Sequence, residues 1–125
     1  MIKVLIIDDE HDVFEMLKDM IELDYDNSVI LHALDGPTAL EHMNNDTFDL
    51  IISDYMLPKM DGISLIKNKS ETKANLTPVI FMSGNIPEDI MEQFNEIESE
   101  IKVLHKPFSP EVFLDHIENF ANKAS

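Results

Sequence analysis

The amino-acid sequence predicts an α/β fold in which a doubly wound parallel β-sheet carries helices on both faces. Five short apolar runs alternate along the chain with segments in which apolar residues recur at helical spacing. This alternation is typical of parallel strands that are joined by crossover helices. Four of the runs end directly on carboxylate, hydroxyl or ammonium side chains. In one parallel sheet those side chains would meet at a single edge, where ligands bind in folds of this class.

The expected elements follow one another in a regular order. We predict strands at Ile2–Ile7, Val29–Leu34, Phe48–Ser53, Val79–Met82 and Lys102–Lys106. Helical patterns follow them at Val13–Ile21, Thr38–Asn45, Ile63–Lys69, Ile90–Ile101 and Phe113–Ala121. Because crossover connections are right-handed, few topologies remain for five such units. We therefore predict the flavodoxin-like strand order 2-1-3-4-5.

Local signals mark the starts of two of the helices. Ser109 followed by Pro110 is typical of a hydroxyl N-cap with proline in the first turn. Pro87 precedes Glu88 and Asp89, whose negative charges complement the dipole of the helix that follows.

The composition limits the kinds of protein that this chain can be. Its 125 residues suit a single domain, 1–125, and its 44% hydrophobic and 27% charged residues are ordinary for a globular protein. No apolar run approaches the ~20 residues that span a bilayer, and the N-terminus does not resemble a signal peptide. Cysteine is absent. We therefore expect a cytoplasmic protein without disulfides or thiol chemistry.

The net charge is −16, from 9 Lys and Arg against 25 Asp and Glu. Such a chain repels phosphate backbones and anionic lipids, so we expect no direct binding to nucleic acid or membrane. Divalent cations and basic protein surfaces are better suited to it. The densest acidic stretch, Glu88–Glu100, is interpreted as a solvated helix face, with a docking surface as the alternative.

Three carboxylates are predicted to converge at the sheet edge. Asp8 and Asp9 follow the first strand and Asp54 follows the third, and these two strands are neighbours in the predicted order. Two such charges ~4 Å apart repel by about 4 kcal/mol at an effective dielectric near 20. Either some pKa values rise or a cation sits among the carboxylates. Oxygen ligands favour a hard cation such as Mg²⁺.

An aspartate beside Mg²⁺ can act as a nucleophile toward phosphorus. The transferred phosphoryl group then needs positive charge and hydrogen-bond donors, which Lys106 and Ser83 could supply from the ends of two other strands. No P-loop pattern is present, so a bound nucleotide is not implied. Taken singly, the aspartates could be a helix cap or a turn, and Ser83 and Lys106 could be loop and surface residues. Those explanations do not account for four such strand ends in one chain.

The order of these motifs resembles the receiver domain of two-component response regulators over essentially the whole chain. Four segments carry the resemblance: Asp8-Asp9, Asp54-Tyr55-Met56-Leu57-Pro58-Lys59-Met60-Asp61-Gly62, Ser83-Gly84 and Lys106-Pro107-Phe108. The second of these is the most specific.

The resemblance implies a role for each site residue. Asp54 would be the phosphoacceptor, and Mg²⁺ would be held by Asp8, Asp9, Asp54 and the backbone carbonyl of Met56. Ser83 and Lys106 would contact the phosphoryl group, and the peptide bond before Pro107 would be cis. The phosphoryl donor would be a phosphohistidine on a sensor histidine kinase or a histidine phosphotransfer protein.

One position departs from the family pattern. Many receivers carry Tyr or Phe three residues before the lysine, and its ring turns inward on activation, whereas this chain carries Val103. We therefore expect any switch to work through the loop after Ser83 and the acidic helix that follows. Met56 and Asn85 occupy positions at which the family tunes the lifetime of the acyl phosphate.

The primary hypothesis is a phosphorylation-controlled signalling module that changes its interactions with an effector domain or protein. It would catalyse only its own phosphorylation and dephosphorylation. The alternative is a non-catalytic interaction domain on the same fold, which Val103 motivates. A third interpretation, an aspartyl phosphatase, is weak because Met56 stands where such an enzyme carries a general acid.

Overall fold

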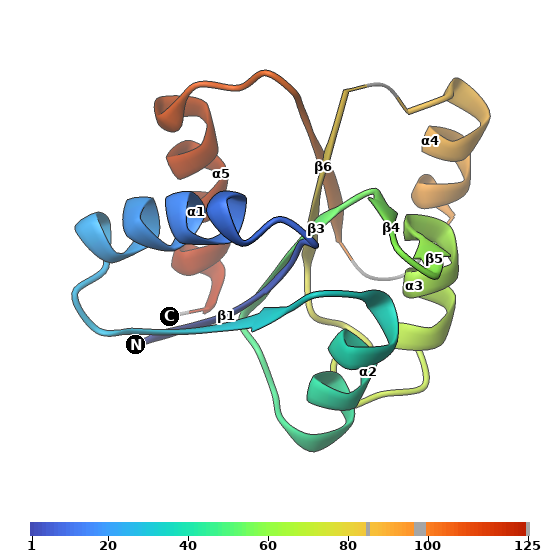
Figure 1. Cartoon of the computed structure of the whole chain (residues 1–125), viewed down its shortest axis with the longest axis horizontal. Helices are drawn as coiled ribbons and strands as arrows, with labels where there is room; N and C mark the ends of the chain where they lie inside the picture. The colour runs from blue at the N-terminus through green and yellow to red at the C-terminus, as the bar shows by residue number, and fades with distance from the viewer. Residues whose placement is uncertain (85, 97–99, 125) are drawn as a thin grey trace.

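The computed structural model describes residues 1–84, 86–96 and 100–124, with the backbone alone for residues 95 and 121–124. Its main feature is a parallel sheet of five strands (Figure 1). These strands are β1 (Ile2–Ile7), β2 (Ser28–Ala33), β3 (Leu50–Asp54), β6 (Val79–Ser83) and β7 (Ile101–His105). Their order is β2-β1-β3-β6-β7, and the predicted order 2-1-3-4-5 is confirmed.

In the described part of the chain, five helices cover the two faces of the sheet. They are α1 (His11–Asp24), α2 (Gly36–Asn45), α3 (Gly62–Lys69), α4 (Glu88–Asn95) and α5 (Pro110–Ala124). Helices α1 and α5 lie on one face, and α2, α3 and α4 lie on the other (Figure 1). Among the described residues, none of the helices is both long and apolar enough to cross a bilayer.

The central strands are apolar on both sides, as strands buried between two helical layers must be. In β1, Val4 and Ile6 pack against the α1 and α5 side, whereas Leu5 and Ile7 pack against the opposite layer. All four are fully buried. This continuous apolar run anchors β1 in the middle of the sheet and so fixes where its last residues, and the aspartates after them, emerge.

The structure confirms the predicted N-cap of the last helix and corrects the bounds of two others. The Val112 N–H donates to Ser109 Oγ at 3.2 Å, so Ser109 caps α5. Helix α2 begins at Gly36, not Thr38, because the Asp35 carboxylate caps it by accepting from the Thr38 N–H at 2.8 Å. Helix α4 ends at Asn95, and Ile101 belongs to β7.

Ile101 was predicted to continue the helical stripe of α4, but it pairs with Val79 of β6. An isolated isoleucine matches both a helix and a strand pattern, and the strand pairing decides between them. The predictions for Asn85, Ile97 and the side chain of Ala121 fall outside the described residues.

A small antiparallel hairpin was not predicted. It consists of β4 (Met56–Leu57) and β5 (Met60–Asp61), in a segment for which the sequence predicted neither a strand nor a helix. Its turn residue Lys59 has a φ of 74°, and Lys59 Nζ lies 3.4 Å from Asp35 Oδ2 at the start of α2. The hairpin holds the segment that follows Asp54.

Candidate functional site

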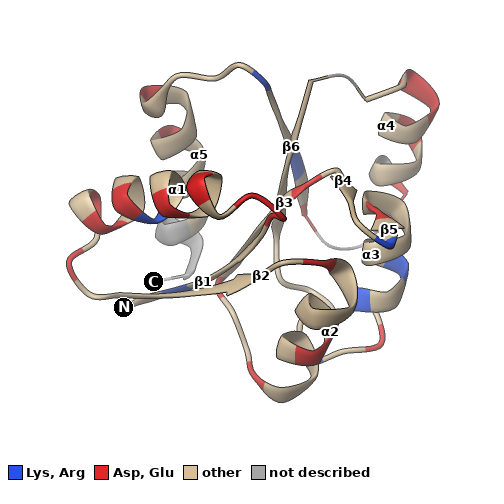
Figure 2. Ribbon diagram, in the orientation of Figure 1, with Lys and Arg blue, Asp and Glu red and all other residues tan. Residues whose placement is uncertain are grey.

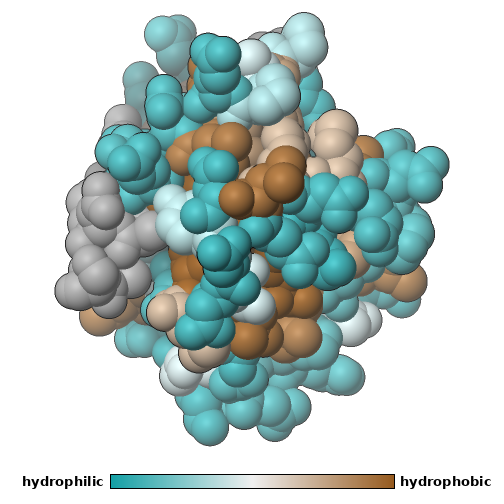
Figure 3. All heavy atoms as spheres, turned by 90° about the vertical axis from the view of Figure 1, so that its left-hand side faces the viewer, coloured by the Kyte–Doolittle hydropathy of each residue, from teal (hydrophilic) through white to brown (hydrophobic). Residues whose placement is uncertain are grey.

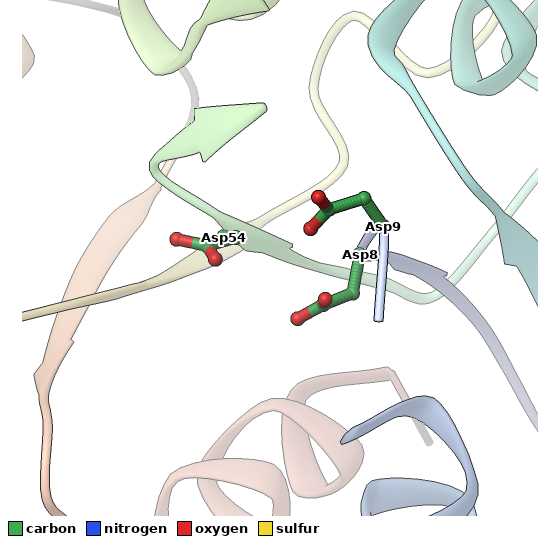
Figure 4. A group of neighbouring side chains, drawn as sticks. All are labelled: Asp8, Asp9 and Asp54. Carbon is green, nitrogen blue, oxygen red and sulfur yellow. The ribbon is translucent and has the colours of Figure 1, made fainter. Parts of the chain in front are cut away.

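Three carboxylates meet at the carboxyl edge of the sheet (Figure 4). Asp8 and Asp9 follow β1 directly, and Asp54 is the last residue of β3, the strand that pairs with β1. One carboxylate oxygen of each residue lies within 4.8 Å of the others. The prediction that these three residues are neighbours is therefore confirmed.

Asp8 is the most deeply buried of the three, with 1% of its surface exposed. Its Oδ1 accepts a hydrogen bond from the Glu10 N–H at 2.8 Å, and its own N–H donates to the Ala33 carbonyl at 3.0 Å. Burial raises the pKa of the Asp8 carboxyl; the Glu10 hydrogen bond opposes that rise, and the nearby charge of Asp54 adds to it. The proton is thus held more tightly here than on an exposed aspartate.

Lys106 brings a positive charge to the same edge. Its Nζ lies 3.4 Å from Asp54 Oδ2. Its backbone N–H donates to the Ser83 carbonyl at 2.8 Å, which extends the β6–β7 pairing by one residue. The peptide bond between Lys106 and Pro107 is cis, as predicted. The ammonium group can therefore partly offset the negative charge of the cluster while staying in contact with solvent.

Ser83 ends β6 and is 8% exposed. The strand register places Met82 opposite Asp54, so Ser83 lies one residue further toward the carboxyl edge. Among the described residues, a Cβ built on Gly84 would meet nothing within 4 Å. The ends of β1, β3, β6 and β7, with the charged and hydroxyl side chains at or just after them, thus lie at one edge of the sheet.

Met56 belongs to β4, pairs with Asp61 of β5 and is 67% exposed. Met56 stands two residues after Asp54, the last residue of β3, and the hairpin holds its backbone in place. The role of its backbone carbonyl as a metal ligand stays a prediction.

The donor set fits a hard divalent cation. Asp8 Oδ2 is buried and has no hydrogen-bond partner within the described part of the chain. Such an atom costs free energy unless a ligand pairs with it. Three carboxylates provide the oxygen ligands that Mg²⁺ takes in proteins, and their mutual repulsion is relieved by a cation.

The sequence did not predict two features beside the site. The ring of Tyr55, the residue after Asp54, packs edge-on against Phe81 of β6 and Phe94 of α4, with ring centroids 5.8 and 6.1 Å away. His32 of β2 contacts the backbone of Asp8. Both contacts depend on which strands and helices are neighbours, which no local sequence pattern encodes.

The fold and the site define an α/β protein with an acidic, cation-binding type of centre at the carboxyl edge of its sheet. The model of the response regulator receiver domain matches residues 4–118. The chain belongs to this family and is a receiver domain of two-component response regulators. Receiver domains of this kind are phosphorylation switches that interact with histidine kinases and effector domains.

Similar proteins agree with this assignment. The transcriptional regulatory protein CpxR of Escherichia coli is 35% identical over 82 residues, which cover 66% of this chain but only 33% of CpxR. The receiver domain of the Francisella response regulator 1452 has a TM-score of 0.84 and 28% identity, with 100% of both chains covered.

A second solved structure shares the fold. The receiver domain of a sensor histidine kinase of Pseudomonas aeruginosa, solved with a magnesium ion coordinated in its active site cleft, has a TM-score of 0.79. It is 18% identical, with 95% of this chain and 96% of that chain covered, and so shows a shared fold.

Proposed function

We propose that Asp54 accepts a phosphoryl group in a two-component phosphorelay and that its phosphorylation switches partner interactions. The observation that carries this proposal is the grouping of Asp54 with two further carboxylates within 4.8 Å and with the Lys106 ammonium at 3.4 Å. Residues 1–125 would act as one receiver domain.

The transfer step follows from the positions of the side chains. A carboxylate oxygen of Asp54 attacks the phosphorus of a phosphohistidine; the new P–O bond forms as the P–N bond breaks, and the imidazole nitrogen leaves with the electron pair. Lys106 offsets the charge of the phosphoryl oxygens, and the Ser83 hydroxyl donates a hydrogen bond to one of them. The product is an acyl phosphate, which water later hydrolyses.

The metal requirement rests on the acidic cluster. Asp8, Asp9 and Asp54, together with the Met56 carbonyl, would hold Mg²⁺, which when bound neutralises charge on the phosphoryl oxygens. Without a cation, a dianionic phosphoryl group would have to approach three carboxylates. The buried Oδ2 atom of Asp8, which lacks a hydrogen-bond partner within the described chain, supports this assignment.

The donor would be a phosphohistidine on a sensor histidine kinase or a histidine phosphotransfer protein. A cavity of about 440 Å³ beside Lys106 offers an apolar contact for it, lined further by Val13, Met16, Met82, Pro107 and Phe108. On the side where α1 and α5 lie, hydrophobic residues reach the surface between hydrophilic ones (Figure 3). Acidic residues recur along α1 (Figure 2) and would complement a basic partner surface.

The output would pass through α4. Val103 is half-buried and packs against the core, so no aromatic ring is available there to turn inward. The Phe81 and Phe94 rings stack at 5.3 Å and join the middle of β6 to α4, and Tyr55 links both to the phosphoacceptor strand. Movement of Ser83 toward the phosphoryl group would shift this aromatic contact and, with it, the acidic first turn of α4.

Labelling with a small phosphodonor tests the proposal. The protein is incubated with acetyl phosphate and Mg²⁺, and its intact mass is measured. We expect one added phosphoryl group that is lost with hydroxylamine, and no addition in EDTA. Asp54→Asn should remove the labelling completely, whereas Asp26→Asn, at an exposed aspartate in a turn, should not change it. Equal labelling of Asp54→Asn and the wild type contradicts the proposal.

A phosphorylated histidine phosphotransfer protein then tests the donor class. Transfer of radioactive phosphate to the wild type, but not to Asp54→Asn, is expected.

Neither the fold nor the comparisons favour the non-catalytic alternative. A partner that binds the phosphorylated and unphosphorylated forms equally would be the result that supports it.

A further inference from the structure

His32 reaches from β2 across to the residue that follows β1. It lies opposite Ile6 in the parallel pairing of these strands, and its Nε2 is 2.8 Å from the carbonyl oxygen of Asp8. Because a carbonyl only accepts, Nε2 carries the hydrogen and donates it. The next residue, Ala33, accepts from the Asp8 N–H at 3.0 Å. Two consecutive residues of β2 thus hold both polar backbone groups of Asp8.

The His32 ring is itself held in place by α1. It stacks on the ring of Phe14, with centroids 4.0 Å apart and planes 2° from parallel. Phe14 is 7% exposed and belongs to the core under α1. Among the described residues, β2 is the edge strand of the sheet and pairs with β1 alone, so His32 has no second strand beside it. The stack on a buried ring therefore fixes the direction of the imidazole donor.

From this geometry we infer that His32 is a positioning residue for the divalent-cation site, acting through the backbone of Asp8. The inference rests on the proposed function of that site. The Asp8 carboxylate must stay buried close to two other carboxylates that repel it, and its Oδ2 has no hydrogen-bond partner among the described residues. The hydrogen bonds to the Asp8 backbone keep this carboxylate in position even before a cation binds. Loss of a residue that hydrogen-bonds to a metal ligand typically weakens metal binding about tenfold or more.

Titration calorimetry with magnesium chloride tests the inference without phosphorylation. His32→Phe keeps an aromatic ring that can stack on Phe14 but removes the donor, so its Kd for Mg²⁺ should rise about tenfold. His32→Gln places an amide donor near the position of Nε2 and should restore most of the affinity. His42→Ala, at a histidine of α2, is the matched control and should bind Mg²⁺ like the wild type.

A kinetic measurement separates positioning from a general loss of structure. With acetyl phosphate as donor, His32→Phe should need about tenfold more Mg²⁺ for half-maximal labelling but should reach the wild-type rate at saturation. Its melting temperature in EDTA should match that of His32→Gln. A lower maximal rate at saturating Mg²⁺ would contradict a pure positioning role.

Three results of the calorimetry also overturn the inference. If His32→Phe binds Mg²⁺ as tightly as the wild type, the hydrogen bond to Asp8 does not position the site, although the proposed function stands. If His32→Gln binds as weakly as His32→Phe, the donor is not what matters. If the wild type itself binds no Mg²⁺, the proposed function fails, and the inference fails with it.

Discussion

Asp8 and Lys69 are buried to the same degree, 1% exposed each, but in different surroundings. Asp8 lies at the open edge of the sheet beside two other carboxylates and near Lys106. Lys69 ends α3, on the same stripe as the buried Leu65 and Ile66. One charge is buried at the candidate site and the other in the packed part of the fold.

Burial pushes both groups toward their neutral forms. It raises the pKa of Asp8, whereas it lowers the pKa of Lys69 from 10.5 to about 8. Lys69 Nζ donates to the Asn75 carbonyl at 2.9 Å, in the turn after α3. The ion pairs found among the described residues do not include Lys69.

The difference lies in what can relieve each cost. At Asp8, a cation at the sheet edge can pair with Oδ2, so the cost of burial contributes to ligand binding. At Lys69, only deprotonation relieves the cost, and the Asn75 carbonyl compensates a part of it. Under the proposed function, the buried charge of Asp8 serves cation binding, whereas the buried charge of Lys69 in α3 is a cost to stability.

The largest expected effect is a pH dependence of the free energy of unfolding, which arises from Lys69. Between pH 8 and 10.5 the unfolded chain keeps this lysine protonated while the folded chain releases the proton, so stability rises with pH. A shift of this size corresponds to about 3 kcal/mol in the free energy of unfolding. Urea unfolding of the wild type and Lys69→Met, compared pH by pH, isolates this group from the other titrating residues.

The stability difference between the two proteins should therefore shrink and then change sign as the pH approaches 10.5, because Lys69→Met has lost the hydrogen bond to the Asn75 carbonyl. A constant difference between them across this range contradicts a lowered pKa for Lys69. Lys67→Met, at an exposed lysine of the same helix, should run parallel to the wild type throughout.

The second expected effect is a gain in stability at neutral pH. Lys69→Met replaces the buried ammonium with an unbranched apolar side chain of similar length. It removes a cost of about 3 kcal/mol but deprives the Asn75 carbonyl of its donor, at about 1 kcal/mol. We expect a net gain of about 2 kcal/mol, measured by urea unfolding at pH 7. A variant less stable than the wild type would show that the ammonium stabilises this turn.

The fold and the main site residues could be predicted because their signals are local. Each sheet strand is an apolar run, and Asp8, Asp54, Ser83 and Lys106 stand at or just after strand ends. The topology rules then bring those ends together. The roles that the family resemblance assigns to these residues stay predictions for the experiments above.

What the sequence could not show depends on packing. Lysine is almost always exposed, so the sequence alone predicts Lys69 on the surface. Its position four residues after Leu65 nevertheless puts it on the buried stripe of α3. The hairpin of β4 and β5 has two residues in each strand, too few for an alternating pattern. The contact of His32 with Asp8 arises only from the register of β1 and β2.

Magnesium should separate the two buried charges. A ligand at tenfold its Kd that binds only the folded chain stabilises it by about 1.4 kcal/mol. We expect this increase in the wild type and in Lys69→Met alike, because the two sites share no partners. Asp8→Asn should show almost no response. Unfolding curves with magnesium chloride or EDTA measure the difference, and an unchanged response in Asp8→Asn would remove Asp8 from the metal site.

The smallest expected effect is the cost of Asp8 itself in the absence of metal. In EDTA at pH 7, Asp8→Asn should be more stable than the wild type by about 1 kcal/mol, because the amide removes a buried charge close to two others. Asp9→Asn is the control and should gain less, since Asp9 is exposed.

The sign of the pH dependence distinguishes this cost from better packing of the amide. The folded chain binds the Asp8 proton more tightly than the unfolded chain, whose pKa is near 3.8, so this carboxyl destabilises the metal-free protein as the pH rises through and above that value. The advantage of Asp8→Asn should therefore shrink as the pH falls toward 3.8. An advantage that is the same at pH 4 and pH 7 would assign the gain to packing of the amide. The buried Asp8 charge would then not destabilise the metal-free protein, and the comparison with Lys69 would fail.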